Sequence, residues 1–351
     1  MSNYLSLNFK QLITHCLVTL DAGLVPYIAG SPGCGKSSVA ATIAKKRKLK
    51  LIDIRLGAID PTVLDGVAVP NQDRTALSML PLDMIPLEDA ELPEGYDGWL
   101  VLLDELPTAL PAVQAATYKF ILDHKVGQAN VHSKVHKMAA GNLITDGAVA
   151  KPITTALGSR LIHFGMKTDY KSWLDWGTEA GLNYRVLDYI ATNNHHLNVF
   201  DPAKVAGDGG TFRCERTWEF LSDLCNVMDE QGIVVEDMLA TVAGAIGNGG
   251  ANEFMAFIKY YDQVPKLEDI VANPSTFPIP PSPAIQVCTL SSIINSLEVS
   301  EDLDKFVPFI DRMAPELKMV FARRAIKSNR DLRHNPIIGK WTTSFAALIS
   351  K

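Results

Sequence analysis

The sequence predicts an α/β protein with a parallel sheet, followed by an all-helical region, and three observations lead to this prediction. A glycine-rich loop lies between an apolar run, Leu24 to Ala29, and a helix-like run that begins at Lys36. Further short apolar runs alternate with helical or loop segments, as in a parallel sheet with crossover helices. These runs are Leu51 to Ile54, Trp99 to Leu103, Val135 to Ala140 and Leu161 to Phe164. From Asp169 onward only helix-like segments follow.

Hydrophobic spacing assigns the helices in order. Residues 9–20 carry apolar residues at helical spacing, which predicts a helix before the first strand. After Pro111 apolar residues again recur at helical spacing, which predicts a second helix, and proline is tolerated in its first turn. The later helix-like segments are Tyr170 to Ala180, Tyr184 to Thr192, Arg216 to Met228, Val235 to Ile246, Ala284 to Leu297 and Leu303 to Arg324.

A change of pattern and a proline-rich stretch divide the chain. Pro274 to Pro283 reads PSTFPIPPSP and can be neither helix nor central strand, so it is interpreted as a connector. We therefore expect an α/β domain over residues 1–168 and a helical domain over 169–273. The connector and a C-terminal helical region then occupy 274–351.

The amino-acid composition limits the classes of protein to which the chain can belong. Hydrophobic residues make up 47% of the chain and charged residues 21%, which is typical of a globular protein. No apolar run approaches the ~20 residues of a membrane span, and the N-terminus lacks the basic-then-apolar plan of a signal peptide. Five cysteines without a C-x-x-C pair indicate neither a disulfide framework nor a zinc site. These features predict a cytoplasmic protein without membrane contact.

The distribution of charge indicates whether the chain is suited to bind nucleic acid or another partner. A net charge of −6 argues against wrapping of nucleic acid by the whole chain. A basic cluster near the C-terminus either contacts a partner or nucleic acid, or forms a solvated helix face. The lack of interleaved aromatic residues favours the solvated face. The cluster consists of Arg323, Arg324, Lys327, Arg330 and Arg333.

Residues 30–37 read GSPGCGKS and match G-x-x-x-x-G-K-[ST], the pattern of a phosphate-binding P-loop. A random chain of this length would contain the pattern only about one time in a hundred. The glycines let backbone N–H groups close around phosphates, and the helix N-terminus adds a favourable dipole. Lys36 supplies a positive charge, and the Ser37 hydroxyl is an oxygen ligand for nucleotide-bound Mg²⁺. The predicted nucleotide-binding residues are Gly30, Ser31, Pro32, Gly33, Cys34, Gly35, Lys36 and Ser37.

Two acids, Asp104 and Glu105, follow the apolar run at 99–103. A buried strand that ends in two acids resembles a Walker B motif. In this interpretation Asp104 holds Mg²⁺, and Glu105 orients and deprotonates the attacking water. Alone, the pair also fits the acidic first turn of a helix. Beside a P-loop the catalytic interpretation is favoured.

Two further polar residues fall at the ends of predicted strands. Asn142 follows the run at 135–140, at the edge of the sheet where a γ-phosphate sensor belongs. The alternative is a turn residue, because Gly-Asn is common turn chemistry. Arg160 precedes the last strand and could reach a neighbouring subunit's nucleotide as an arginine finger. The alternative is a surface arginine.

In this order the motifs resemble those of the AAA+ ATPases, and the match narrows to the MoxR-like branch, related to the dynein-type AAA modules. The resemblance covers roughly the first two-thirds of the chain. It is carried by DPTVLDG at 60–66, by LVLLDELPTALPAVQAATYKFILD, AAGN and ALGSRLIHF, and by RTWE at 216–219. The family implies an α/β nucleotide-binding domain with a helical lid, and a ring, usually hexameric, with nucleotide between subunits.

The resemblance also implies roles for residues of the lid and of two inserts. Arg216 would be the lid's sensor arginine, with Arg213 as the competing candidate and an ordinary ion pair as the alternative role. Val67 to Leu80 and Lys125 to Val135 look like inserts of this branch, and the second could form a hairpin. Both would face the pore of the ring or a partner, unless they are ordinary surface loops.

The function expected from these motifs is ATP hydrolysis that drives remodelling of a protein client by a homo-oligomeric ring, with ATP and Mg²⁺ bound. The resemblance further implies a partner with a von Willebrand factor A domain. A DNA-directed AAA+ motor and a slow, nucleotide-dependent binding module are the alternatives.

Overall fold

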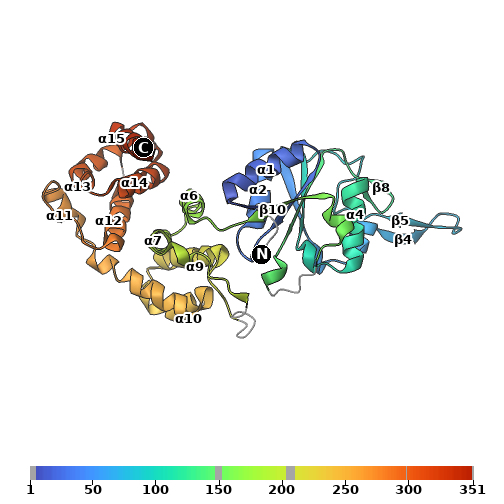
Figure 1. Ribbon diagram of the computed structural model, residues 1–351, viewed down its shortest axis with the longest axis horizontal. Coiled ribbons are helices and arrows are strands. Elements are labelled where there is room, and N and C mark those ends of the chain that lie inside the picture. Colours follow the sequence, from blue (N-terminus) through green and yellow to red (C-terminus); the bar gives the residue numbers. More distant parts are fainter. Residues whose placement is uncertain (1–4, 147–151, 203–209, 298, 350–351) are drawn as a thin grey trace. The chain divides into compact units, whose positions relative to one another are not determined.

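The computed structural model describes residues 5–146, 152–202, 210–297 and 299–349 (Figure 1). The chain divides into two compact units. The first unit contains Met1–Asp169 and Phe200–Gly209, and the second contains Tyr170–Val199 and Gly210–Lys351. Across the described ranges, no helix combines the length and the apolar character that crossing a membrane would require.

A six-stranded parallel sheet forms the centre of the first unit. In spatial order its strands are β1 (Ser6–Leu7), β10 (Leu161–Met166), β2 (Val25–Ala29), β9 (Val135–Gly141), β6 (Gly98–Asp104) and β3 (Leu49–Arg55). β2 and β6 lie between neighbouring strands and are buried along almost their whole length, which explains their continuous apolar sequences. The short β1 is not predicted from the sequence. With the P-loop after β2, this sheet gives the unit the α/β P-loop fold of AAA+ type, and the predicted fold class is confirmed.

Helices cover both faces of this sheet (Figure 1). They are α1 (Phe9–Asp21), α2 (Lys36–Lys46), α3 (Thr62–Asp65), α4 (Pro111–Asp123) and α5 (Thr155–Gly158). Leu100 and Leu102 of β6 join the core formed with α1 and α2, whereas Val101 and Leu103 join the core formed with α4. Successive residues of β6 therefore face opposite sides, as the period of two in a strand requires.

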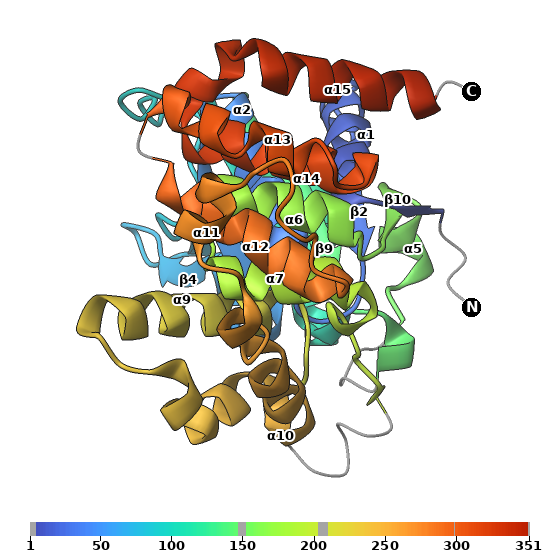
Figure 2. The same ribbon diagram turned by 90° about the vertical axis from the view of Figure 1, so that its left-hand side faces the viewer.

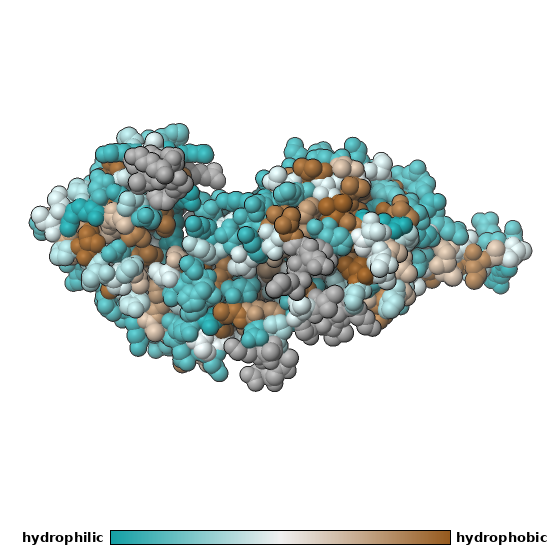
Figure 3. All heavy atoms as spheres, viewed as in Figure 1, coloured by the Kyte–Doolittle hydropathy of each residue, from teal (hydrophilic) through white to brown (hydrophobic). Residues whose placement is uncertain are grey.

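Two antiparallel hairpins belong to the first unit. β4 (Val67–Pro70) pairs with β5 (Leu77–Leu80), and β7 (Lys125–Val126) pairs with β8 (Ala129–Asn130). The second hairpin is predicted from the sequence. The first carries exposed leucines, and Figure 3 shows apolar residues on its surface where it projects from the unit.

Gly127, in the turn of the second hairpin, packs against α3 and against β5 of the first hairpin. Its N–H donates to the Leu64 carbonyl oxygen, which lies 3.0 Å away. Gly127 has φ of +57°, and a Cβ atom added there would lie 2.6 Å from the Asp65 carbonyl oxygen and 3.5 Å from Cβ of Met79. Glycine is therefore required both for the backbone conformation and for the close approach.

The second unit is helical, and its helices form two hydrophobic cores. The described helices of this unit are α6 (Tyr170–Ala180), α7 (Tyr184–Thr192), α9 (Glu215–Gln231), α10 (Leu239–Ile258), α11 (Leu267–Ala272), α12 (Pro283–Ser296), α13 (Val307–Ile310), α14 (Pro315–Ser328) and α15 (Pro336–Ile349). The segment 303–324, predicted as one amphipathic run, is broken between α13 and α14 because Pro315 starts a new helix. α10 contains a kink at Gly247, where φ is +78° and ψ is 158°.

A buried ionic network joins α7, α12 and α14, which lie together in Figure 2. The fully buried Asp188 carboxylate is paired with Arg324 and accepts hydrogen bonds from Ser291 Oγ at 2.9 Å and Tyr261 Oη at 2.5 Å. Burial raises the pKa of Tyr261 far above its usual range, so this hydroxyl remains a donor. The sequence-based interpretation of a solvated arginine face is therefore wrong for Arg324.

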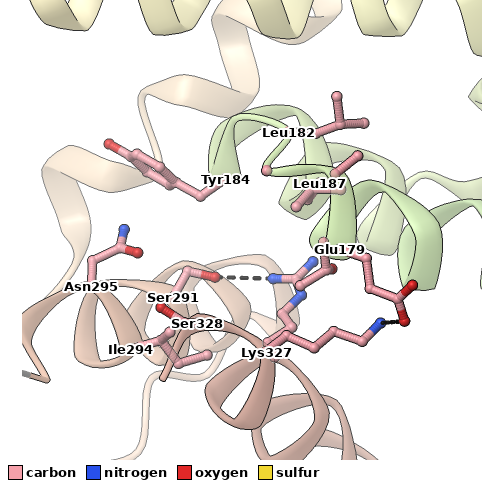
Figure 4. A pocket seen from close by; sticks show the side chains of 13 residues that line it. Glu179, Leu182, Tyr184, Leu187, Ser291, Ile294, Asn295, Lys327 and Ser328 are labelled. Carbon is pink, nitrogen blue, oxygen red and sulfur yellow. Dashed lines mark hydrogen bonds and ion pairs between the residues drawn. The ribbon is translucent and has the colours of Figure 1, made fainter. Parts of the chain in front are cut away.

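A cavity of about 390 Å³ lies beside this network, between the α6–α7 turn, α12 and α14 (Figure 4). Lys327, a second member of the basic cluster, donates to the Asp175 carbonyl oxygen at 2.6 Å and pairs with Glu179 at 3.3 Å. Tyr184 and Asn295 lie on the opposite side of the cavity. Both cations that line the cavity thus have acidic partners of their own.

Candidate nucleotide-binding site

The P-loop leaves β2 at Gly30 and enters α2 at Lys36. Gly33 and Gly35 have φ of +76° and +89°, a region that L side chains rarely adopt. The helix cap, Gly35, provides no side-chain hydrogen bond to the first turn of α2. Backbone N–H groups of that turn are consequently available to an anion, and the helix dipole favours negative charge there.

Lys36 points into the loop and reaches the neighbouring strand. Its ammonium group donates to the carbonyl oxygens of Gly30 at 2.8 Å and Ser31 at 2.9 Å, and to Asn142 Oδ1 at 2.9 Å. The residue is only 8% exposed. β2 and β9 are adjacent, with Ala29 in register with Gly141, and this pairing brings Asn142 to the P-loop. The structure thus brings together two residues predicted to contact phosphate.

The acids at the end of β6 lie next to the start of α2. Ser37 Oγ donates to Asp104 Oδ2 at 2.9 Å, and the N–H of Glu105 donates to Asp104 Oδ1 at 2.8 Å. A serine hydroxyl and one carboxylate are oxygen donors of the kind that Mg²⁺ takes together with substrate phosphates. The predicted pair, Ser37 and Asp104, therefore fits this ion.

Glu105 adopts a left-handed conformation, with φ of +59° and ψ of 30°, at the end of the strand. Its side chain lies close to Gly57, because a Cβ atom added at Gly57 would be 2.8 Å from Glu105 Oε2. The missing side chain at Gly57 leaves room for the carboxylate of the predicted general base. Gly57 could not be predicted from the sequence, since no motif surrounds it.

A second close contact lies behind Asn142. A Cβ atom added at Gly141 would be 2.2 Å from Cδ of Pro107 and 2.9 Å from the Tyr27 hydroxyl oxygen. Pro107 belongs to the turn that follows Glu105. The turn that carries the acids and the strand that carries Asn142 are thus packed without space between them.

We expect Gly141→Ala to destabilise the protein by about 3 kcal/mol, at the upper end for overpacking, because a proline ring cannot rotate away. Urea denaturation followed by circular dichroism measures the change. Gly158→Ala is the matched control, since its Cβ atom would meet only His163 Nε2 at 4.0 Å. Equal stability of the two variants would contradict the packing described for Pro107.

Asp146 is a residue at this site that sequence analysis missed. It ends the short 3₁₀ helix Ile144–Asp146, which follows Asn142, and is 8% exposed. Its Oδ2 accepts from the Leu143 N–H at 3.1 Å. Burial raises the pKa of Asp146, while this hydrogen bond and the charge of Lys36 act in the opposite direction. An acid four residues after Asn142 was the available signal, but no motif distinguishes it from an ordinary turn acid.

Arg160 lies at the end of α5, folded back on its own unit. Its guanidinium donates to the Ala156 carbonyl oxygen at 2.7 Å and to Ser159 Oγ at 2.8 Å. The guanidinium carbon is 4.5 Å from the centre of the Tyr118 ring, a cation–π distance. Among the described residues, none accepts a hydrogen bond from its buried Nε atom.

The two lid arginines belong to the second unit. Arg216 is exposed on the first turn of α9. Arg213 precedes the helix, is paired with Glu253, and has its Cδ 3.0 Å from where a Cβ atom on Gly250 would be. Within this unit Arg213 therefore already has the ordinary ion pair considered as an alternative role, whereas Arg216 is exposed.

Comparisons with known proteins constrain the function little. No protein-family model matches the chain, and no curated protein matches it. Among solved structures it is similar to a protein from Cytophaga hutchinsonii that is named a "putative ATPase". The two are 18% identical with a TM-score of 0.37, over 50% of this chain and 52% of the other. The chain thus matches about half the length of that protein, and so distant a likeness carries no argument about function.

Proposed function

We propose that the protein is an ATPase that binds ATP with Mg²⁺ at the P-loop and hydrolyses it. The observation that supports this proposal is the convergence of three strand ends and α2 at one edge of the sheet. Lys36 lies 2.9 Å from Asn142, and Ser37 lies 2.9 Å from Asp104. In open α/β sheets, ligands bind at the carboxyl ends of the strands, where these residues lie.

Each residue has a distinct role in this proposal. The P-loop N–H groups and Lys36 bind the phosphates, and Asn142 donates its amide to the γ-phosphate. Ser37 and Asp104 would hold Mg²⁺, which neutralises charge on the phosphates when it is bound. Glu105 accepts the proton of the attacking water. Its backbone is left-handed, and its carboxylate lies beside Gly57, where there is no side chain.

Glu105→Gln tests the proposed general base. We expect the variant to bind ATP with Mg²⁺ as the wild type does and to hydrolyse it about 10²-fold more slowly, because the amide cannot accept the proton. Phosphate release measures turnover, and calorimetry measures binding. Glu94→Gln, at an exposed glutamate of the same unit, is the matched control and should hydrolyse ATP at the wild-type rate. Wild-type turnover in Glu105→Gln would assign the base to another residue.

The finer part of the proposal comes from the MoxR-like sequence resemblance. We propose that the protein assembles as a homo-oligomeric ring, that closure of a helical lid on nucleotide involves Arg216, and that the ring remodels a protein client. A partner with a von Willebrand factor A domain belongs to the same proposal. The projecting hairpin β4–β5, with its exposed leucines, is a surface suited to such a contact.

Hydrolysis rates separate this proposal from the two alternatives. A rate that duplex DNA leaves unchanged, with steady turnover under excess ATP, is expected for a protein remodeller. Stimulation by DNA would replace it with a DNA-directed motor. If single-turnover experiments show that bound ATP is released many times before it is hydrolysed, the protein is instead a nucleotide-dependent binding module.

A further inference from the structure

The backbone of Glu105 is hydrogen-bonded on both sides of the residue. Its N–H donates to Asp104 Oδ1 at 2.8 Å, and its carbonyl oxygen accepts from the Thr108 N–H at 2.9 Å and from Thr108 Oγ1 at 2.8 Å. The residue also has the left-handed conformation, with φ of +59°. Because the backbone is fixed in this way, the place of the carboxylate depends on the side-chain torsions and on what surrounds the side chain.

Gly57 is a close neighbour of that carboxylate from a different part of the chain. It lies in the 3₁₀ turn Leu56–Ala58, which follows β3, the strand that pairs with β6. A Cβ atom added at Gly57 would lie 2.8 Å from Glu105 Oε2 and 2.7 Å from Thr108 Oγ1. Both distances are shorter than real Cβ atoms show, so the carboxylate in this position excludes a side chain at residue 57.

The close contact at Gly57 differs in kind from the one at Gly141. The nearest atoms at Gly141 belong to a proline ring, whereas those at Gly57 are the ends of two rotatable side chains. The φ angle of Gly57 lies outside the left-handed region, so alanine suits the backbone there. A methyl group at residue 57 would therefore displace the Glu105 carboxylate and the Thr108 hydroxyl at little cost in stability.

We infer that Gly57 is a positioning residue for Glu105, because the missing side chain lets the carboxylate stay where it accepts the proton of the attacking water. The inference rests on the proposed function and adds to it a residue that governs hydrolysis without governing nucleotide binding. A misplacement of about 1 Å can slow a reaction by about 10²-fold. Gly57 belongs neither to the P-loop nor to the residues that would hold Mg²⁺, so its replacement acts on the chemical step.

Gly57→Ala tests the inference. We expect it to bind ATP with Mg²⁺ as the wild type does and to have a kcat lower by about tenfold or more, because its carboxylate is displaced. Calorimetry measures the affinity, and phosphate release measures kcat. Ala58→Ser is the matched control: it also adds a single heavy atom, to the neighbouring exposed residue of the same turn, and should hydrolyse ATP at the wild-type rate.

A double variant distinguishes positioning from a general disturbance of the fold. In the Glu105→Gln background, Gly57→Ala should cause no further loss of kcat, because no base remains to be displaced. A residue that only supports the fold would slow hydrolysis by the same factor in both backgrounds. Thermal melting establishes that each variant is folded. If Gly57→Ala does not fold, adding Thr108→Ala removes one of the two close contacts, and the same loss is expected relative to Thr108→Ala alone.

The outcomes separate this inference from the proposed function. If the wild type does not hydrolyse ATP, or if Glu105→Gln hydrolyses it at the wild-type rate, the proposed function is wrong. If both of those expectations hold while folded Gly57→Ala has the wild-type kcat, the positioning inference alone is overturned. Weaker ATP binding by Gly57→Ala, or an equal loss of kcat in the Glu105→Gln background, would also overturn it.

Discussion

Lys36→Ala is expected to abolish tight ATP binding. The ammonium group is 8% exposed and donates to three oxygens at 2.8 to 2.9 Å, so it is fixed beside the site where phosphates would bind. Removing one partner of a buried, hydrogen-bonded charge pair costs about 2–5 kcal/mol. The upper half of this range corresponds to a loss of affinity of roughly 10²-fold or more.

Calorimetry with ATP and Mg²⁺ measures this effect, and Lys45→Ala provides its control. Lys45 lies in the last turn of the same helix and is exposed, so its replacement should leave nucleotide affinity unchanged. Thermal melting of Lys36→Ala establishes that the fold survives the loss of the lysine's hydrogen bonds. Wild-type affinity in a folded Lys36→Ala variant would contradict the assignment of the P-loop as a nucleotide site.

The core of the site could be predicted because it consists of residues that follow strands. In a parallel sheet the carboxyl ends of the strands meet at one edge, so Lys36, Asp104 and Asn142 come together once the strands are recognised. The contacts of Lys36 with Asn142 and of Ser37 with Asp104 agree with that reasoning. Strand recognition in turn was reliable since β2 and β6 are buried and continuously apolar.

Residues that act through packing or through folded-back turns could not be predicted in this way. Gly57 and Gly141 matter because of what lies next to them, Glu105 and Pro107, and glycine occurs in many loops for other reasons. Asp146 is buried because of how the turn after β9 folds, with its carboxylate accepting from the Leu143 N–H, and no local pattern encodes that turn. Arg324 belongs to a basic cluster whose sequence is typical of a solvated helix face. The buried Asp188, on another helix, nevertheless pairs with it.

Arg160→Ala is expected to retain ATP binding and to lose hydrolysis by about 10³-fold or more, the scale for an arginine that stabilises the transition state of phosphoryl transfer. The prediction requires that Arg160 serves the nucleotide of a neighbouring subunit. To do so, its guanidinium must leave the Ala156 carbonyl oxygen and the face of Tyr118. These are contacts with neutral groups, and a developing charge on the γ-phosphate attracts a guanidinium more strongly than they do.

Mixing two inactive variants tests whether the site is shared between subunits. Arg160→Ala subunits have an intact Glu105, and Glu105→Gln subunits have an intact Arg160. If Arg160 acts in trans, some interfaces of a mixed ring combine an intact base with an intact arginine, and hydrolysis should partly return. Phosphate release from the mixture measures the recovery, and native mass spectrometry verifies that mixed assemblies form.

A second mixture provides the control, because Lys36 and Glu105 belong to the same subunit's site. Lys36→Ala mixed with Glu105→Gln should stay inactive, since no subunit in that mixture has both residues intact. Recovery in the first mixture and none in the second assigns Arg160 to the neighbour's nucleotide. If both mixtures stay inactive although mixed assemblies form, Arg160 either acts within its own subunit or is structural, stacked on Tyr118, and the shared-site mechanism fails.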